Sequence, residues 1–436
     1  MTDAPAPPRT DEAARSWLPR ALRVLRHRDL ALVEVGNSVS QLGTWMQYVG
    51  FGWAISGLTR WPFAVALSFV AQFSPSLVLA PFAGAIADRF DRRHVVIMGN
   101  LAMTAPPVAI GLFIADHSLT IPWLLALATM GGIAQALTYP AQMAVVPRLV
   151  PEDEVGQAIS LNAGLMSFTR MLGPGAGGLA IGLWGLQSAF YLNGISFLAV
   201  VAAWMFVRPE GTRADRAAGS FLVEMRRGLA YARRVPLVRH LLILVAVVSM
   251  FVFHGPLMPL FARDVLHGGV TAYSLLSSAT GIGAIFGAFI AGEIVTDRMR
   301  RTAIAAGGLG SAAALLMFSV SRSLALSVVC LAGFGLSYFA MHASVTTVLM
   351  LAVPDDYRGR IMGLFGMFAT GGVPIAAILG GLVGSWLGPP TAVAIGGSAI
   401  GAYAVWFVAS GVLRLVRTET PRREVHTPTP RAADIA

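Results

Sequence analysis

The chain has 436 residues, of which 56% are hydrophobic and 12% are charged. Water-soluble domains carry about 25% charged residues, and a soluble chain of this length would still need a polar exterior. The composition therefore excludes an ordinary soluble protein and indicates that lipid covers most of the surface. The formal net charge is +10, and all 32 basic residues are arginine. Such a charge would suggest nucleic-acid binding in a soluble protein. The placement of the arginines along the chain must therefore show whether nucleic acid or membrane topology explains the charge.

The scarcity of cysteine and the absence of lysine exclude further classes of function. Cys330 is the single cysteine, so the chain forms no intramolecular disulfide and no metal site built from several thiolates. Because lysine is absent, no phosphate-binding loop of the Gly-x-x-x-x-Gly-Lys type exists, which excludes ATP hydrolysis on this chain. We expect no enzymatic activity, no metal and no cofactor.

Apolar stretches long enough to cross a bilayer recur along the chain. A transmembrane helix needs about 20 such residues, and charged or Pro/Gly-rich segments separate the stretches. They predict an all-α integral membrane protein with twelve transmembrane helices, at 30–57, 63–86, 94–115, 121–146, 156–181, 186–207, 240–262, 271–294, 302–320, 324–352, 361–386 and 391–415.

The longest polar segment between predicted spans divides the chain into halves of six helices. Its residues 208–239 include eight arginines, and Phe221, Met225 and Leu229 would share one helix face there. This central loop is therefore either a helix on the membrane surface or a solvated linker. The predicted organisation is a cytoplasmic tail (1–29), an N-terminal six-helix bundle (30–207), the cytoplasmic central loop (208–239), a C-terminal six-helix bundle (240–416) and a disordered cytoplasmic tail (417–436).

The arginines give the predicted orientation. If both termini lie in the cytoplasm, 28 arginines fall in cytoplasmic segments, whereas only Arg60, Arg263 and Arg322 fall outside. Arg170 lies within a span. This bias follows the positive-inside rule, so the basic charge reflects membrane topology, and we expect no nucleic-acid partner.

The two halves repeat each other in sequence. A shift of 203 positions aligns Gly177, Gly178 and Gly185 with glycines in the second half, and a shift of 209 aligns Asp88 with Asp297. Two parallel six-helix repeats, the predicted pseudo-symmetric bundles, are typical of transporters that rock about a site near the bilayer midplane.

A charged motif joins the second and third spans. The sequence Gly84-Ala-Ile-Ala-Asp88-Arg89-Phe-Asp91-Arg92-Arg93 resembles the signature loop of the major facilitator superfamily, although Asp91 stands where that pattern has glycine. A weaker copy in the second half has Asp297, Arg298 and Arg301, but Glu293 replaces its first glycine. We expect these residues to form a gating loop, with its arginines paired to acids across the interface between the halves. The alternative is a simple positive-inside anchor.

A second motif lies in the fifth span. Gly173-Pro174-Gly-Ala-Gly177-Gly178 resembles the Gly-Pro-x-x-Gly-Gly motif of antiporter-type exporters of that superfamily, with Thr169 in place of an earlier glycine. Proline kinks a helix and glycines allow close helix packing. Export and generic small-residue packing both fit this motif.

The resemblance extends over most of the chain. Segments 40–47, 81–93, 140–151, 257–264 and 356–360 are similar to the bacterial branch of the superfamily that contains the enterobactin exporter. The resemblance implies a monomeric secondary transporter of the bacterial inner membrane, an exporter of a drug or a siderophore-like metabolite that is driven by proton exchange. It does not identify the cargo.

Polar residues inside the predicted spans are candidates for the substrate or proton path, because intramembrane charge is costly and usually functional. Arg170 either attracts an anionic substrate group or is a structural hydrogen-bonding residue. Glu34 either carries the coupling proton or reaches water at the interface, and Asn37 and Gln41 extend one helix stripe from it toward the expected cavity. His254 and His342 either titrate or pack between helices, and the prolines after His254 should break that helix.

Several functions remain open at this point. The first is proton-coupled export of a small amphipathic molecule. The second is lipid or lysolipid transport, or metabolite import, and the third is a membrane scaffold or sensor without transport.

Overall fold

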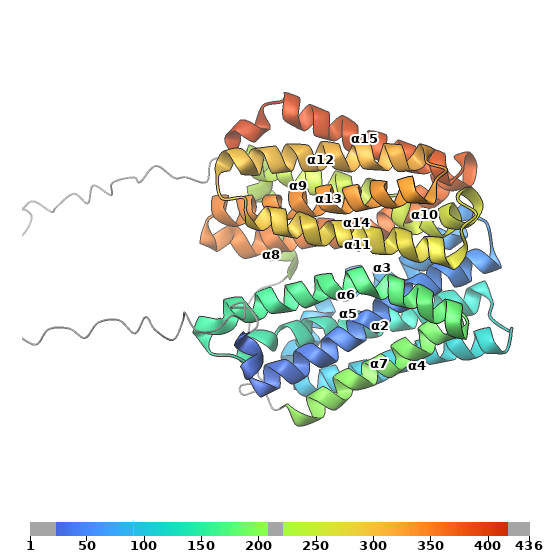
Figure 1. Ribbon diagram of the computed structural model, residues 1–436. Coiled ribbons are helices and arrows are strands. Elements are labelled where there is room, and N and C mark those ends of the chain that lie inside the picture. The colour runs from blue at the N-terminus through green and yellow to red at the C-terminus, as the bar shows by residue number, and fades with distance from the viewer. Residues whose placement is uncertain (1–22, 90, 208–220, 417–436) are drawn as a thin grey trace, which may run out of the picture.

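The structure is a computed structural model that describes residues 23–89, 91–207 and 221–416, and this part of the chain is helical almost throughout (Figure 1). The long helices of the first half are α2 (Arg28–Leu58), α3 (Pro62–Arg89), α4 (Arg92–Ala115), α5 (Ile121–Met143), α6 (Val155–Trp184) and α7 (Gln187–Phe206). The second half contains α8 (Phe221–Arg234), α9 (Pro236–Phe251), α10 (His254–Leu260), α11 (Gly269–Gly292), α12 (Asp297–Val320), α13 (Leu324–Ala352), α14 (Asp355–Leu387) and α15 (Pro389–Ala409).

The surface of these helices is suited to lipid. Within the described residues, nine helices are long and apolar enough to cross a membrane. Large apolar side chains also face outward along their length, among them Phe289, Val320 and Trp386. A water-soluble protein does not leave so much apolar surface exposed. The chain is a multi-span membrane protein.

Helices contact each other mostly within their own half. In the first half α2 packs against α6 and α7, and in the second half α13 packs against α11 and α12. Two helix pairs join the halves extensively, α3 with α14 and α6 with α11. Figure 1 shows the second-half helices as one layer above the first-half helices.

The repeat seen in the sequence has a structural counterpart at two helix ends. Gly185 terminates α6 with φ of 83°, and Gly388, 203 positions later, terminates α14 with φ of 82°. L-residues rarely adopt this region, whereas glycine does so without steric cost. The two glycines therefore occur at equivalent positions because both helices end with the same backbone turn.

The predicted seventh span is broken. α9 ends at Phe251, Val252 and Phe253 interrupt the helix, and α10 starts at His254 and continues into a short π-helix, η4 (Phe261–Val265). The break lies immediately before His254, where the prolines of α10 were expected to disturb the helix. The preceding helix, α9, begins at Pro236, four residues before the predicted start of the seventh span at 240.

The central loop contains a helix, as the first of the two sequence alternatives requires, and this helix, α8, packs on the protein. Met225 and Leu229 pack against the apolar core of the second half. Tyr231 stacks on Tyr357 of α14, with their ring centroids 4.5 Å apart. The apolar face of α8 therefore covers α14 and α9 of the protein itself. The side chain of Phe221 lies outside the described part of the structure.

The predicted N-terminal tail is partly incorporated into the fold. A short 3-10 helix, η1 (Val24–Arg26), precedes α2, and Val24 is fully buried. Arg26 and His27 both bind the carboxylate of Glu154, which precedes α6, with His27 Nε2 2.7 Å from one oxygen. Residues 24–27, which the sequence assigns to the tail, therefore belong to the fold. Residues 1–22 and the predicted disordered tail from 417 lie outside the described residues.

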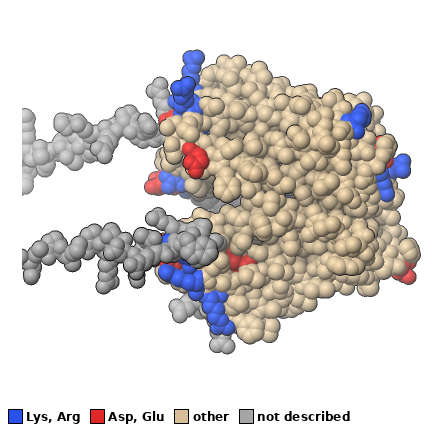
Figure 2. Space-filling view, in the orientation of Figure 1, with Lys and Arg blue, Asp and Glu red and all other residues tan. Residues whose placement is uncertain are grey.

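Charged residues gather mainly at one end of the molecule, where α2, α4, α12 and α14 begin, and few are visible at the other end (Figure 2). We call these the arginine-rich end and the opposite end. The long helical surface between them shows almost no charge in this view. An uncharged band between two polar ends is the distribution that a bilayer requires.

Candidate functional site

A cavity of about 570 Å³ lies between the two halves. Helices of both halves line it, and the walls are largely aromatic and aliphatic. Its lining residues from the first half are Trp45, Tyr48, Val49, Phe69, Phe73, Arg170 and Pro174, and those from the second include Ser249, His254, Tyr273, Ser277, Tyr338, Phe339, His342 and Val373. This volume lies within the range of about 300–1,000 Å³ that small-molecule sites occupy.

Arg170 is placed on the wall of this cavity, as one of the sequence alternatives required. Its guanidinium carbon lies 4.9 Å from the ring centroid of Trp45 and 5.3 Å from that of Phe339. Trp45 belongs to the first half and Phe339 to the second. The guanidinium is therefore held between aromatic faces of both halves, and the described part of the chain places no carboxylate against it.

His254 and His342 line the same cavity. His254 is buried and lies edge-on to Phe334 at 4.6 Å between ring centroids, and its Nδ1 has no hydrogen-bond partner among the described residues. His342 contacts Phe365 at 4.6 Å between ring centroids. Each ring packs between helices, as one of the sequence alternatives requires, and also borders the cavity. Titration of these histidines stays a prediction.

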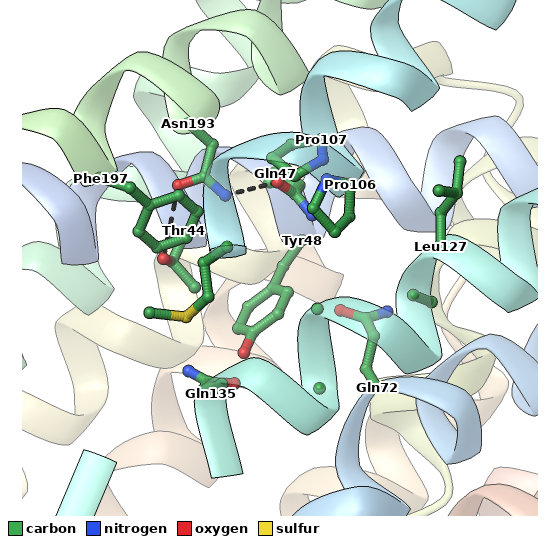
Figure 3. A pocket seen from close by; sticks show the side chains of 14 residues that line it. Thr44, Gln47, Tyr48, Gln72, Pro106, Pro107, Leu127, Gln135, Asn193 and Phe197 are labelled. Atoms are coloured by element: carbon green, nitrogen blue, oxygen red, sulfur yellow. Dashed lines mark hydrogen bonds between the residues drawn. The ribbon is translucent and has the colours of Figure 1, made fainter. Parts of the chain in front are cut away.

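A second, smaller pocket of about 50 Å³ lies inside the first half (Figure 3). Amide side chains surround it, and Asn193 donates a hydrogen bond to Gln47. Tyr48 points toward Gln135 in this pocket and also lines the large cavity, so it separates the two spaces. A polar space of this size suits ordered water.

The three other predicted path residues do not line the large cavity. Glu34 is buried, and both of its carboxylate oxygens accept hydrogen bonds from Asn162 of α6, at 3.1 and 3.2 Å. Asn37 accepts a hydrogen bond from Gln142 of α5. Gln41 is half-buried on the same helix and does not reach the cavity wall. The polar stripe of α2 therefore joins helices of the first half, because its successive side chains face α6 and α5.

The predicted gating loop is described only in part. Gly84, Asp88 and Arg89 end α3, and their side chains lie outside the described part of the structure. Arg92 is buried at the start of α4. Asp91, at the position where the superfamily pattern has glycine, accepts a hydrogen bond of 2.9 Å from the backbone N–H of Arg93 and so caps α4.

Two of the loop arginines, Arg93 and Arg301, bind helix ends in their own half, where acid pairs across the interface were expected. Arg93 donates to the carbonyls of Trp204 and Met205 at the end of α7, at 2.9 and 2.8 Å. In the second half Arg301 donates twice to the carbonyl of Val416, at 3.0 and 2.7 Å, beyond α15. Unpaired carbonyls and the helix dipole make a helix end a favourable partner for a cation.

The remaining charges of the second copy also act locally. Asp297 binds Arg300 at 3.2 Å on the first turn of α12, and Arg298 is exposed. These side chains thus organise the start of α12. Their contribution to gating stays a prediction.

The glycines of the antiporter-like motif bring α6 against two neighbours. A Cβ added at Gly173 or Gly177 would lie 2.3 or 2.8 Å from atoms of α2, within the same half, and one at Gly178 would lie 2.0 Å from Ser274 Oγ of α11, in the other half. Pro174 lines the large cavity. Gly178 therefore allows a close approach to the other half, whereas Gly173 and Gly177 allow close packing within the first half.

Sequence reasoning missed the aromatic residues that hold Arg170. Trp45 and Phe339 lie 125 positions before and 169 positions after Arg170, and nothing in their local sequence distinguishes them from lipid-facing residues. The amide pocket was also missed, although the glutamines and asparagines within apolar stretches are a usable signal, because such side chains need partners inside a membrane.

Relatives of the chain are bacterial transporters. It is 23% identical to macrolide efflux protein A of Streptococcus pyogenes over 366 residues, covering 81% of this chain and 88% of the relative. It is 24% identical to the enterobactin exporter of Shigella boydii, covering 84% and 88%, and 22% identical to the staphyloferrin A transporter of Staphylococcus aureus, covering 78% and 85%.

Solved structures share the fold. A bacterial homologue of the human lysosomal transporter Spinster, in an inward-facing and unoccupied conformation, has a TM-score of 0.67 at 15% identity, covering 92% of this chain and 98% of that one. The nucleoside transporter NupG has a TM-score of 0.70 at 12% identity, covering 88% and 99%.

Residues 20–433 match the family described as transmembrane secretion effector. The signature-like loop, the multi-span helical fold and the efflux proteins among its relatives agree with this match. The chain is a membrane transporter rather than an enzyme, and it belongs to the transmembrane secretion effector family of the major facilitator superfamily.

Proposed function

We propose that this protein is a secondary active exporter of a small amphipathic molecule, driven by proton exchange. The observation that carries the proposal is the 570 Å³ cavity, which the two halves line jointly with aromatic rings and one cation. A site shared by two pseudo-symmetric halves can be exposed to either side in turn when the halves rock. Efflux and siderophore transport among the relatives favour export of such a molecule.

The proposed architecture is twelve transmembrane helices in two six-helix bundles, with α9, α10 and η4 together forming the seventh span. The contacts between the halves that support a rocking motion lie between the cavity and the opposite end. Arg263 sits 4.8 Å from the ring centroid of Trp53 and donates to the carbonyl of Ser56. The backbone N–H of Phe63 donates to Ser385 Oγ at 3.1 Å. These contacts join the halves at that end, and they would have to separate for release there.

In the proposed topology both termini and the arginine-rich end face the cytoplasm of a bacterial cell, and the chain works as a monomer in the inner membrane. The 28 cytoplasmic arginines support this orientation. Export then means that substrate enters from the arginine-rich end and leaves at the opposite end.

Transport in everted membrane vesicles tests this function. Vesicles from cells that produce the chain should take up an amphipathic fluorescent dye when respiration acidifies the lumen, and a protonophore should stop the uptake. Vesicles without the chain provide the control. Uptake that survives collapse of the pH gradient would exclude proton coupling, and movement of a fluorescent lysolipid in place of the dye would favour lipid transport.

A further inference from the structure

The charge of the large cavity has one sign. Among the described residues that line it, Arg170 is the only side chain with a permanent charge, and none is a carboxylate. The other polar groups are hydroxyls and the two imidazoles. A cavity with this composition offers a cationic ligand no carboxylate to balance its charge and places the positive Arg170 beside it, whereas an anionic ligand would be paired.

The guanidinium of Arg170 keeps its donors available. It has five N–H groups in a planar fork, and it lies on the faces of Trp45 and Phe339, which attract a cation without accepting a conventional hydrogen bond. The hydroxyls of Tyr48, Tyr139 and Tyr338 are also close enough to interact with its charge. The rings thus stabilise the charge and orient the fork while leaving its N–H groups unused. Such a group binds carboxylate, sulfonate or phosphate oxygens in pairs.

The backbone beside Arg170 lies at a contact between the halves. A Cβ added to Gly281 of α11 would lie 3.0 Å from the backbone oxygen of Arg170 and 2.8 Å from Cα of Met171. The Arg170 side chain projects from this crossing toward rings of both halves. A ligand bound to its fork would therefore touch both halves at once, as coupling of binding to a rocking motion requires.

We propose that the substrate class is the amphipathic organic anion: an acidic group that binds the fork of Arg170, attached to an aromatic or aliphatic body that fills the apolar cavity. This inference rests on the proposed export function. It excludes amphipathic cations as preferred cargo, because the same guanidinium repels them.

A matched pair of fluorescent probes tests the inference on the purified full chain in nanodiscs. The anion 8-anilinonaphthalene-1-sulfonate and the neutral N-phenyl-1-naphthylamine share the same aromatic body and differ in the sulfonate. We expect Arg170→Gln to weaken binding of the anion by at least about 10-fold, the loss expected for one charge-assisted hydrogen-bonded pair, and to leave binding of the neutral probe within about twofold. Arg170→Lys should retain part of the anion affinity.

Two controls make the result decisive. Arg322→Gln removes an exposed arginine outside the cavity and should change neither affinity, and empty nanodiscs report binding to lipid. Unchanged binding of the neutral probe to Arg170→Gln shows that the cavity is intact. Equal losses for both probes, or none for the anion, would overturn the proposal.

Different results would reject the anionic substrate class and the proposed export function. Gradient-dependent uptake of a cationic dye that is unaffected by Arg170→Gln would reject the anion while leaving export in place. Selective anion binding without any vesicle transport would reject export and keep the site.

Discussion

Glu34 and Arg170 are ionisable side chains within long apolar helices, and their partners come from distant parts of the chain. The sequence singles out both residues because charge is rare in such segments. It does not show that Glu34 meets Asn162, 128 positions away, or that Arg170 meets Trp45 and Phe339. A residue's own type and neighbours mark it as special, whereas its role depends on which helices pack against it.

Glu34→Gln tests whether Glu34 carries the coupling proton. The substitution keeps hydrogen-bonding capacity toward Asn162 and removes the ionisable group. If Glu34 carries the proton, vesicle transport should lose its dependence on the pH gradient while binding of the 8-anilinonaphthalene-1-sulfonate probe to the purified protein persists. Glu293→Gln, at an exposed position, is the matched control. Wild-type dependence on the gradient in Glu34→Gln would remove Glu34 from the coupling path.

At the scale of helices, the long apolar segments and their punctuation predict most elements well. The tenth predicted span, 324–352, coincides with α13, since Ser321 to Ser323 and Pro354 interrupt an otherwise apolar stretch. Predictions fail where packing decides the outcome. α8 covers the second half because Tyr231 stacks on Tyr357 of α14, a contact that the sequence of α8 alone does not show. The prolines after His254 predict a disturbed helix, but the break itself falls just before them, at Val252 and Phe253.

Gly283→Ala should destabilise the packing of α11 on α13. The added Cβ would lie 1.9 Å from the carbonyl oxygen of Ala332, and at the same crossing Gly335 approaches Thr280 just as closely. Backbone atoms cannot yield locally, so overpacking should cost about 1–3 kcal/mol and lower the midpoint of thermal unfolding in detergent. Gly292→Ala, where nothing lies within 4 Å, should not lower it. Equal midpoints for both variants would contradict the close crossing.

At the scale of the molecule, the glycine repeat produces equivalent contacts between the halves. Gly178 of α6 meets Ser274 of α11, and Gly381 of α14, 203 positions later, meets Phe63 of α3. These are the two helix pairs that join the halves most extensively. The sequence predicts the repeat, but the identity of the partner helices depends on three-dimensional packing that one sequence does not encode in any short pattern.

A disulfide across this interface should arrest transport. A Cβ added to Gly384 would lie 3.3 Å from Cβ of Pro62, close to the spacing of about 3.5–4.5 Å that a disulfide needs. With Pro62→Cys and Gly384→Cys combined, oxidation should abolish vesicle uptake because the halves can no longer separate at the opposite end, and a reductant should restore it. Each single variant should stay active, because its only other cysteine is the buried Cys330. An oxidised, cross-linked protein that still transports would exclude rocking at this contact.

The two repeats place different side chains at one equivalent position of the cavity wall, and this difference would orient a bound ligand. The position equivalent to Arg170 in the second half is Val373, 203 residues later, and both side chains line the cavity. Corresponding helices thus present a guanidinium on one side and an isopropyl group on the other. An elongated molecule with one acidic end would be bound in a single orientation, with its head toward α6 and its body toward α14.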